Sequence, residues 1–297
     1  FEKDVQYLKS DNRSNISYFL EHNVLLRRFT LSVGVLANYN SALNEGIHFY
    51  PGIDASYRIG DNFRLYGSWN RALRMPTFTD LYYEGKTNKG NPDLKPEESE
   101  AFEVGLKYNT YFLRAHIAGF YRKGKNMIDW VKEKPEDIWE SQNLTKVDNL
   151  GFETNLSLLP RELGNERFFI RKIELGYAFI HQDKDSEGYI SNYALDYLKH
   201  KFTAQLSHSI WKGFSATWYV RWQDRAGSYT KYENLKPAYE EPYAPYCLVD
   251  MKVNWEYQRL NLYAELNNLL NSTYYDLGNI PQPGIWFKAG FRYSFKY

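Results

Sequence analysis

The side chains best suited to chemistry in this 297-residue sequence are aromatic. They lie with charged residues in the stretches between segments of alternating apolar and polar residues. The candidates for contact with a ligand are Trp130, Trp139, Tyr229, Tyr239, Tyr243 and Tyr275. Aromatic rings give flat apolar contact area with a polar handle, which suits a large planar or macrocyclic ligand. The alternative is that the same rings pack loops together or lie at a membrane interface.

A second possible chemistry is metal binding. Asp183, Asp185 and Glu187 have a calcium-like spacing, but Ala194 occupies the twelfth position, where an EF-hand loop carries glutamate. A solvated acidic loop tip is the alternative. Cys247 is the single cysteine, so the sequence predicts neither a disulfide framework nor a cysteine-rich metal site. No Ser/His/Asx set is singled out for catalysis, so we predict neither an enzyme nor a cofactor.

Composition narrows the class of protein. Aromatic residues make up 18% of the chain, yet the mean hydropathy is −0.63. No run approaches the roughly 18 apolar residues of a membrane-spanning helix. The formal net charge of +1 argues against nucleic acid as a partner. A polar average with many aromatic residues is typical of a membrane β-barrel, in which lipid-facing and lumen-facing residues alternate.

Alternation of apolar and polar residues recurs along the chain and predicts thirteen strands. The predicted ranges are 15–26, 29–39, 47–59, 63–72, 99–108, 112–123, 148–159, 168–182, 199–211, 214–224, 246–257, 260–267 and 285–297. In the tenth range Phe214, Trp218, Val220 and Trp222 share one face, which we expect to meet lipid, and Thr217, Tyr219 and Arg221 share the other. The thirteenth has an apolar, aromatic face over its whole length, as in a barrel's closing strand.

Short and long connections alternate strictly between these strands. The long ones are residues 40–46, 71–98, 124–147, 183–200, 225–245 and 268–284. Membrane barrels have short periplasmic turns and long extracellular loops. We therefore expect the C-terminus in the periplasm and the candidate ligand residues in extracellular loops. An odd strand number cannot close a simple antiparallel barrel, so we expect further strands upstream.

Residues 74–97 carry a composite motif. Its first half contains Arg74, Pro76, Thr77, Phe78, Asp80, Leu81 and Tyr82, and its second half Gly90, Asn91, Pro92, Leu94, Pro96 and Glu97. The pattern resembles the TonB-dependent outer-membrane receptors. Gly-Phe-Glu at 151–153 and the Asn-rich segment 267–271 resemble further motifs of that family, so the resemblance covers most of the chain. The prolines hold a defined loop path, and we expect Arg74 and Glu97 to form a charge pair where the strands re-enter.

The resemblance implies an all-β fold, with residues 1–297 forming the C-terminal part of a barrel of 22 strands around an N-terminal plug. About nine strands, the plug and its coupling segment would lie outside this sequence. It also implies a receptor in the bacterial outer membrane that binds a scarce small-molecule nutrient and imports it to the periplasm. Its partners would be a TonB-type energy-coupling protein, membrane lipid and a surface lipoprotein.

The cargo implied by the resemblance within residues 74–83 is cobalamin, with a ferric siderophore or haem as the alternative. A passive porin or adhesin barrel, or a barrel enzyme, is the alternative of another class. A porin would lack the motif at 74–97.

Overall fold

The computed structural model describes residues 12–41, 46–134, 136–164, 167–185, 188–191, 197–233, 236–277 and 280–295. Contacts divide the chain into two compact units. The first contains Phe1–Leu106, Ala118–Gly151 and His181–Asp196, and the second contains Lys107–Ile117, Phe152–Ile180 and Tyr197–Tyr297. No helix of the described residues is long and apolar enough to cross a membrane.

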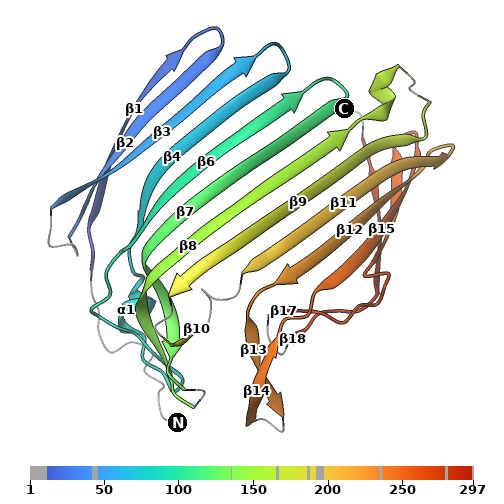
Figure 1. Ribbon diagram of the computed structural model, residues 1–297. Coiled ribbons are helices and arrows are strands. Elements are labelled where there is room, and N and C mark those ends of the chain that lie inside the picture. Colours follow the sequence, from blue (N-terminus) through green and yellow to red (C-terminus); the bar gives the residue numbers. More distant parts are fainter. Residues whose placement is uncertain are drawn as a thin grey trace. The chain divides into compact units, whose positions relative to one another are not determined.

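Among the described residues, thirteen strands follow one another in a single antiparallel order (Figure 1). They are β1 (Asn15–Leu25), β2 (Phe29–Asn40), β3 (Ile47–Ile59), β4 (Phe63–Arg74), β6 (Glu97–Asn109), β7 (Leu113–Lys132), β8 (Trp139–Leu158), β9 (Ile170–Asp185), β11 (Leu198–Trp211), β12 (Phe214–Arg225), β15 (Tyr246–Tyr257), β16 (Leu260–Asn267) and β19 (Trp286–Tyr293). The order begins with β1 and ends with β19. The predicted all-β class and the thirteen strands are confirmed.

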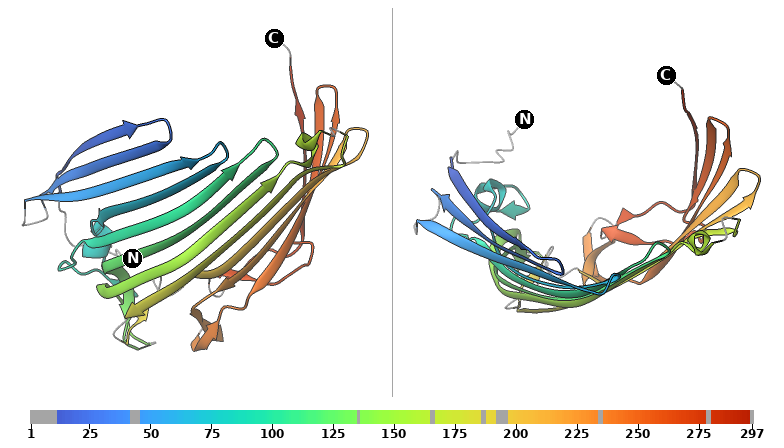
Figure 2. Two further views of the ribbon diagram at one scale, coloured as in Figure 1. Left: turned by 45° about the horizontal axis from the view of Figure 1, so that its top comes forward. Right: turned by 90° about the horizontal axis from the view of Figure 1, so that it is seen from above.

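Shorter elements occupy the connections. They are α1 (Phe78–Tyr82), β5 (Asn88–Lys89), η1 (Pro160–Leu163), β10 (Ile190–Ser191), β13 (Ser228–Glu233), β14 (Lys236–Pro242), β17 (Tyr275–Leu277) and β18 (Ile280–Pro281). β5 adds to β8 and β10 adds to β7, while β13–β14 and β17–β18 form hairpins of their own. The connection that carries α1 and β5 joins β4 to β6 and lies at one end of these strands (Figure 2).

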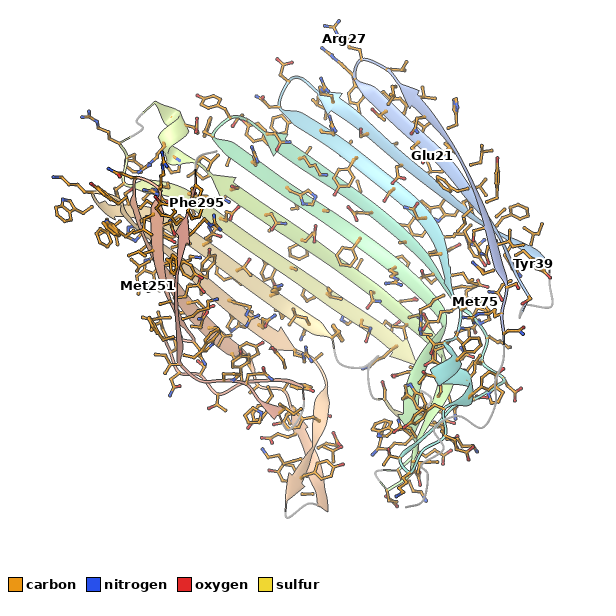
Figure 3. The ribbon with its side chains drawn as sticks, turned by 180° about the vertical axis from the view of Figure 1, so that it is seen from behind. Glu21, Arg27, Tyr39, Met75, Met251 and Phe295 are labelled. Carbon is orange, nitrogen blue, oxygen red and sulfur yellow. The ribbon has the colours of Figure 1, made fainter. Side chains whose placement is uncertain are left out.

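The first unit separates apolar and polar side chains by strand register. Leu20 pairs with Val35 across β1 and β2, and Ile53 pairs with Trp69 across β3 and β4. On the alternate face the Ser32 hydroxyl donates to the Glu21 carboxylate at 2.7 Å. Figure 3 shows Glu21 between the two ends of the β1–β2 hairpin, which are marked by Arg27 and Tyr39. One face is therefore mainly aliphatic and aromatic, and the other carries the hydrogen-bonding groups together with Phe19 and Leu36.

The second unit shows the same separation and confirms the predicted division of β12. Trp218 and Trp222 are paired with Leu206 and Phe202 of β11, whereas Thr217 is paired with Ser207. The hydroxyl oxygens of Thr217 and Ser207 lie 3.1 Å apart. We call the two faces the apolar face and the polar face.

The last strand also follows its predicted alternation. Phe287 and Phe291 of β19 are 63% and 73% exposed on the apolar face. On the polar face Lys288 and Lys252 both bind the Glu265 carboxylate, at 2.5 and 2.8 Å. β19 ends at Tyr293, earlier than predicted, and Lys296 and Tyr297 lie outside the described residues.

The largest departure from the predicted elements concerns residues 124–147, which we expected to form a loop. β7 runs on to Lys132 and β8 begins at Trp139, so the connection between them is only residues 133–138. Trp130 therefore lies in a strand and Trp139 begins one. The extension is bonded on both sides, because β10 pairs with β7 and β5 with β8.

Candidate ligand-binding site

The motif at residues 74–97 contains the short helix α1, which starts with a capping box. The Thr77 hydroxyl accepts from the Asp80 backbone N–H at 3.1 Å, and the Asp80 carboxylate accepts from the Thr77 N–H at 2.9 Å. This reciprocal pair satisfies two backbone donors at the start of α1. We predicted only a proline-held loop here, although Thr-x-x-Asp after Pro76 is a legible start signal for a helix.

Glycine is required later in the same connection. A Cβ on Gly90 would lie 2.8 Å from the carbonyl carbon of Leu81. The Gly90 N–H donates to the Tyr83 carbonyl at 2.6 Å, and the Asn91 N–H donates to that of Asp80 at 2.9 Å. The Gly-Asn pair therefore folds directly back on α1.

The expected charge pair of the motif is confirmed. The Arg74 guanidinium donates to both carboxylate oxygens of Glu97, at 2.6 and 2.5 Å, which is the strong bidentate geometry. The Glu97 side chain is 10% exposed and also accepts from the Ile128 N–H at 2.8 Å. Glu97 therefore ties the end of β4 and the start of β6 to β7.

The extended β7–β8 hairpin holds this connection through one amide side chain. The Asn143 oxygen accepts from the Lys95 N–H at 2.8 Å, and its amino group donates to the Lys95 and Asn126 carbonyls at 2.9 and 2.7 Å. On the other side the Ser191 hydroxyl donates to the buried Asp129 carboxylate. Sequence reasoning noted Asp129 only as a polar neighbour of Trp130 and missed Asn143, because the partners of both residues are tens of residues away.

The two candidate tryptophans belong to this anchored region. The Trp130 ring lies edge-on to Tyr83, with centroids 6.3 Å apart, and the Lys132 ammonium lies 4.5 Å from the centroid of the Trp139 ring. The Trp139 backbone N–H donates to the Thr87 carbonyl at 2.9 Å. The Trp130 ring and the Trp139 backbone therefore both contact the 74–97 connection, and these contacts are structural.

Three candidate tyrosines of the second unit come together. The Tyr229 ring centroid lies 5.1 Å from that of Tyr243 and 5.6 Å from that of Tyr275, on which it stacks. The Lys231 ammonium lies 5.9 Å from the centroids of Tyr229 and Tyr275, and the Arg225 guanidinium lies 5.2 Å from that of Tyr243. We call these five residues the tyrosine cluster. Aromatic faces beside cations form a surface able to hold a ring-bearing ligand.

A second aromatic pair supports the cluster from the base of β15. The Tyr246 and Tyr274 centroids are 4.6 Å apart, and the Tyr246 hydroxyl lies 2.6 Å from an oxygen of Asp276. Arg225 donates to the Asp276 carbonyl at 2.9 Å. The residues next to Tyr275 are thus fixed to β12 and β15.

The remaining tyrosine candidate has no ring contact with the cluster among the described residues. Tyr239 of β14 is 52% exposed and is paired across the hairpin with Lys231. The structure therefore brings Tyr229, Tyr243 and Tyr275 together and leaves Tyr239 outside the cluster. Lys231 and Arg225, two of the charged residues near these tyrosines in the sequence, are part of it.

The ion pair of the β13–β14 hairpin sets its charge state. Lys231 Nζ lies 2.6 Å from a carboxylate oxygen of Glu241, which also accepts from the Tyr229 hydroxyl at 3.2 Å. The hydrogen bond from Lys231 lowers the pKa of the Glu241 carboxyl, and the bond to Glu241 raises the pKa of the Lys231 ammonium. Burial, followed by the bond to Glu241, raises the pKa of Tyr229.

These shifts predict a pH dependence for the hairpin. Because the pKa of the Glu241 carboxyl is lowered in the fold, its ionised form stabilises the hairpin fully at pH values above the ordinary pKa of 4.5. This stabilisation is lost as the pH falls through the lowered pKa. We expect β13–β14 to open several-fold more often at pH 3.5 than at pH 6, measured by hydrogen exchange corrected for the intrinsic rate. In Lys231→Met the step between these pH values should shrink. A step of unchanged size in that variant would contradict the assignment.

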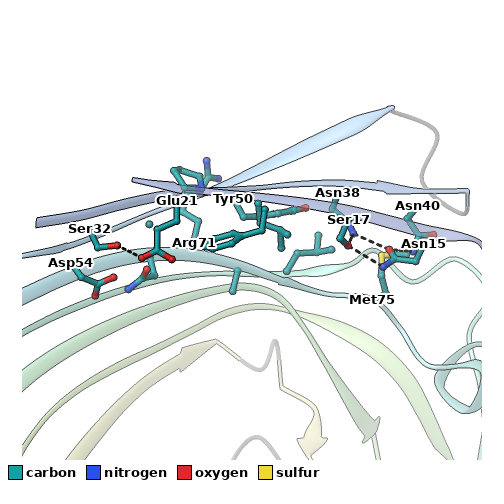
Figure 4. Close-up of a pocket in the computed structure, with 18 of the residues that line it drawn as sticks. Asn15, Ser17, Glu21, Ser32, Asn38, Asn40, Tyr50, Asp54, Arg71 and Met75 are labelled. Atoms are coloured by element: carbon teal, nitrogen blue, oxygen red, sulfur yellow. Dashed lines mark hydrogen bonds between the residues drawn. The ribbon is translucent and has the colours of Figure 1, made fainter. Parts of the chain in front are cut away.

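A hollow of about 720 Å³ lies on the polar face of β1 to β4 (Figure 4). Glu21, Asp54 and Arg71 line it with several amides, and Asn38 donates to Ser17 at 2.8 Å and to Asn15 at 2.9 Å. None of the ligand residues predicted from the sequence lines this hollow.

The candidate calcium site gains no support. Asp183 is 3.0 Å from Lys146 Nζ, and Glu187 lies outside the described residues. Among the residues that the structure describes, no group of three or more His, Cys, Asp or Glu side chains is placed to hold a metal ion.

Comparison with known proteins identifies the family. The sequence model described as TonB dependent receptor-like, beta-barrel matches residues 4–269. This chain therefore belongs to the TonB-dependent receptors, in their β-barrel part.

Curated relatives come from several bacteria. The vitamin B12 transporter BtuB of Vibrio vulnificus is 26% identical in an alignment that covers 57% of this chain and 36% of that protein. The ferrienterobactin receptor of Escherichia coli is 22% identical in an alignment that covers 90% of this chain and 38% of that protein. The chain spans about a third of the length of these relatives, whose names are those of transporters and receptors.

Solved structures share the fold. The siderophore receptor PirA from Pseudomonas aeruginosa matches 99% of this chain and 49% of its own, with 17% identity and a TM-score of 0.72. A variant of the ferric enterobactin receptor PfeA from Pseudomonas aeruginosa, in complex with enterobactin, matches 95% of this chain and 46% of its own, with 20% identity and a TM-score of 0.74.

Proposed function

We propose that this chain forms part of the wall of an outer-membrane receptor that binds a small-molecule nutrient and passes it to the periplasm with energy from a TonB-type protein. The observation that carries the binding role is the tyrosine cluster, in which Tyr229 meets two further rings and two cations. The membership in the TonB-dependent receptor family carries the transport role. In this proposal residues 1–297 belong to one barrel domain.

The two faces of the strands fit a wall between lipid and water. Phe291 and Leu262 are paired on the apolar face, and Lys288 and Glu265 are paired on the polar face. The apolar face would contact the lipid of the bacterial outer membrane, and the polar face would line the interior. The hairpin β13–β14, with the other long connections, would be extracellular, and the C-terminus periplasmic. A plug and a surface lipoprotein would be partners supplied from outside this chain.

Cobalamin is the cargo we favour, because the vitamin B12 transporter of Vibrio vulnificus is among the relatives and stacked tyrosines suit a large macrocycle. A ferric siderophore is the second candidate. The ferrienterobactin receptor relative, which matches 90% of this chain, supports it. The full receptor should be titrated with cyanocobalamin, ferric enterobactin and haem by calorimetry. Binding of the iron chelate or of haem in place of cobalamin would overturn the preference.

The tyrosine cluster is tested by substitution in the full receptor. Tyr229→Ala removes the central ring, and we expect ligand affinity to fall by about tenfold or more, since an aromatic contact contributes roughly 1–3 kcal/mol. Tyr239→Ala in the same hairpin is the matched control, because Tyr239 has no ring contact with the cluster among the described residues. The measurement is the dissociation constant by calorimetry. Equal affinities for the two variants would remove the cluster from the binding site.

A further inference from the structure

Two arginines contact one serine of β11. This serine lies beside the end of β12 that is farther from the tyrosine cluster. Arg161 of the turn helix η1 donates through Nη2 to the Ser209 hydroxyl at 2.6 Å and through Nε to the Phe168 carbonyl at 2.9 Å. Arg171 of β9 donates through Nε to the same hydroxyl at 2.9 Å. One oxygen atom therefore bridges two guanidinium groups, which carry the same charge.

A β-bulge delivers the second arginine to this point. In the pairing of β11 with β9, Ser207 is opposite Lys172 and His208 is opposite Ile170, so Arg171 is the extra residue. A bulge re-aims a side chain that regular alternation would send to the other face. Arg171 consequently reaches Ser209, which lies on the polar face with Ser207.

Among the described residues, no carboxylate balances the charge of this pair. The described contacts of Arg161 and Arg171 are the three hydrogen bonds to neutral oxygens, and neither has a carboxylate partner among the described residues. The neighbouring Glu174 is bound by Lys172 at 2.7 Å. Each guanidinium has about five N–H donors, so most of them lack a described acceptor. The Ser209 hydroxyl accepts twice and keeps its own proton for donation.

We infer that Arg161, Arg171 and Ser209 form a binding site for an oxyanion of the phosphate or carboxylate type. Paired guanidinium groups bind such anions through parallel, charge-assisted hydrogen bonds, and a hydroxyl donor completes the set. An anion there would relieve the repulsion between the two arginines. It would also fasten the β8–β9 turn to β9 and β11.

The position of the site restricts the source of the anion. Ser209 alternates with His208, which is paired with Ala216 on the apolar face. A lipid headgroup would approach along that apolar face, whereas the site opens on the polar one. The oxyanion is therefore either free in solution or carried by an acidic side chain of the receptor outside the described residues. The inference does not depend on the proposed cargo, because Ser209 pairs with Ser215 near the start of β12, whereas Arg225 of the tyrosine cluster ends that strand.

The free anion is tested with inorganic phosphate on the full receptor in detergent. At constant ionic strength, replacing chloride by phosphate should raise the Tm saturably at millimolar concentration, since ligand that binds only the folded state stabilises it. Arg171→Gln and Arg161→Gln should each raise the phosphate concentration that gives half of the Tm increase by about tenfold, because one charge-assisted bond contributes roughly 1.5 kcal/mol. Lys212→Gln, an exposed basic residue of the β11–β12 turn, should leave the effect unchanged. Arg171→Lys should recover part of it.

The carboxylate source gives a different result. A protein carboxylate seated between the guanidiniums would make the Tm insensitive to phosphate, and it would be visible in a structure of the full receptor determined without phosphate. Phosphate sensitivity would then appear only when that acidic residue is replaced by its amide. The inference is overturned if the Tm does not respond to phosphate and no carboxylate contacts both arginines. It is equally overturned if Lys212→Gln weakens the phosphate effect as much as Arg171→Gln does.

Discussion

Val220→Arg is expected to destabilise the folded receptor by about 2–4 kcal/mol, which is the cost of a guanidinium on the lipid face near the centre of a membrane barrel. Val220 is paired with Ala204 on one side and with Val249 on the other, so its neighbours across both strands are apolar. No cross-strand partner there offers an acceptor to the new charge. The measurement is the free energy of unfolding in urea, with the receptor folded in lipid vesicles.

The matched control is the same substituent at the adjacent position of the same strand. Tyr219 is 41% exposed on the polar face and is paired with Gln205 and Asp250, so Tyr219→Arg should cost less than about 1 kcal/mol. Vesicles matter for this comparison, because the penalty arises from hydrocarbon around Val220. Equal losses at the two positions would show that these faces do not divide lipid from water.

The strands were predictable because a barrel wall repeats one simple pattern. Side chains alternate between two environments along each strand, and the alternation ends at turns rich in Gly and Asn. β3, β15 and β16 accordingly have the predicted bounds. The same regular alternation allowed the apolar and polar faces of β12 to be predicted from the sequence.

The alternation of apolar and polar residues did not predict how far β7 and β8 extend. In these extensions the two faces of a strand no longer differ in polarity. In the C-terminal half of β7 both Asp129 and Val131 are buried, at 1% exposure each, so the polarity of a residue no longer indicates its face. The extension is fixed instead by distant partners, such as Asn143 for Lys95 and Ser191 for Asp129. Nothing in the local sequence encodes contacts across so many residues.

The residue types of the candidate site could be predicted from the sequence, but which tyrosines form the cluster could not. Tyr229 and Tyr239 belong to the same hairpin and are indistinguishable by residue type. Tyr229 is 9% exposed against 52% for Tyr239, because Tyr243 and Tyr275 cover only the first. Tyr275 comes from another connection, and its approach depends on the hydrogen bonds that hold Asp276.

The Arg74–Glu97 pair of the family motif leads to the second large effect. Arg74→Ala is expected to lower the free energy of unfolding by about 1–3 kcal/mol, because it leaves a nearly buried carboxylate with the Ile128 N–H as its remaining described donor. The range lies below that of a fully buried pair, since the Arg74 side chain is 49% exposed. Hydrogen exchange should rise most in the connection that carries α1.

A neighbouring arginine provides the control for this pair. Arg71 of the same strand lies 3.2 Å from Glu100 and 3.9 Å from Glu98, in ion pairs whose side chains are all more than a third exposed. Exposed pairs contribute about 0–1 kcal/mol, so Arg71→Ala should have a small effect and leave the exchange of the α1 connection unchanged. The double variant Arg74→Ala, Glu97→Gln should recover part of the loss, because it removes the stranded charge. If the double variant is less stable than Arg74→Ala alone, the cost does not arise from an unpaired Glu97, and the bidentate pair is not what holds the motif in place.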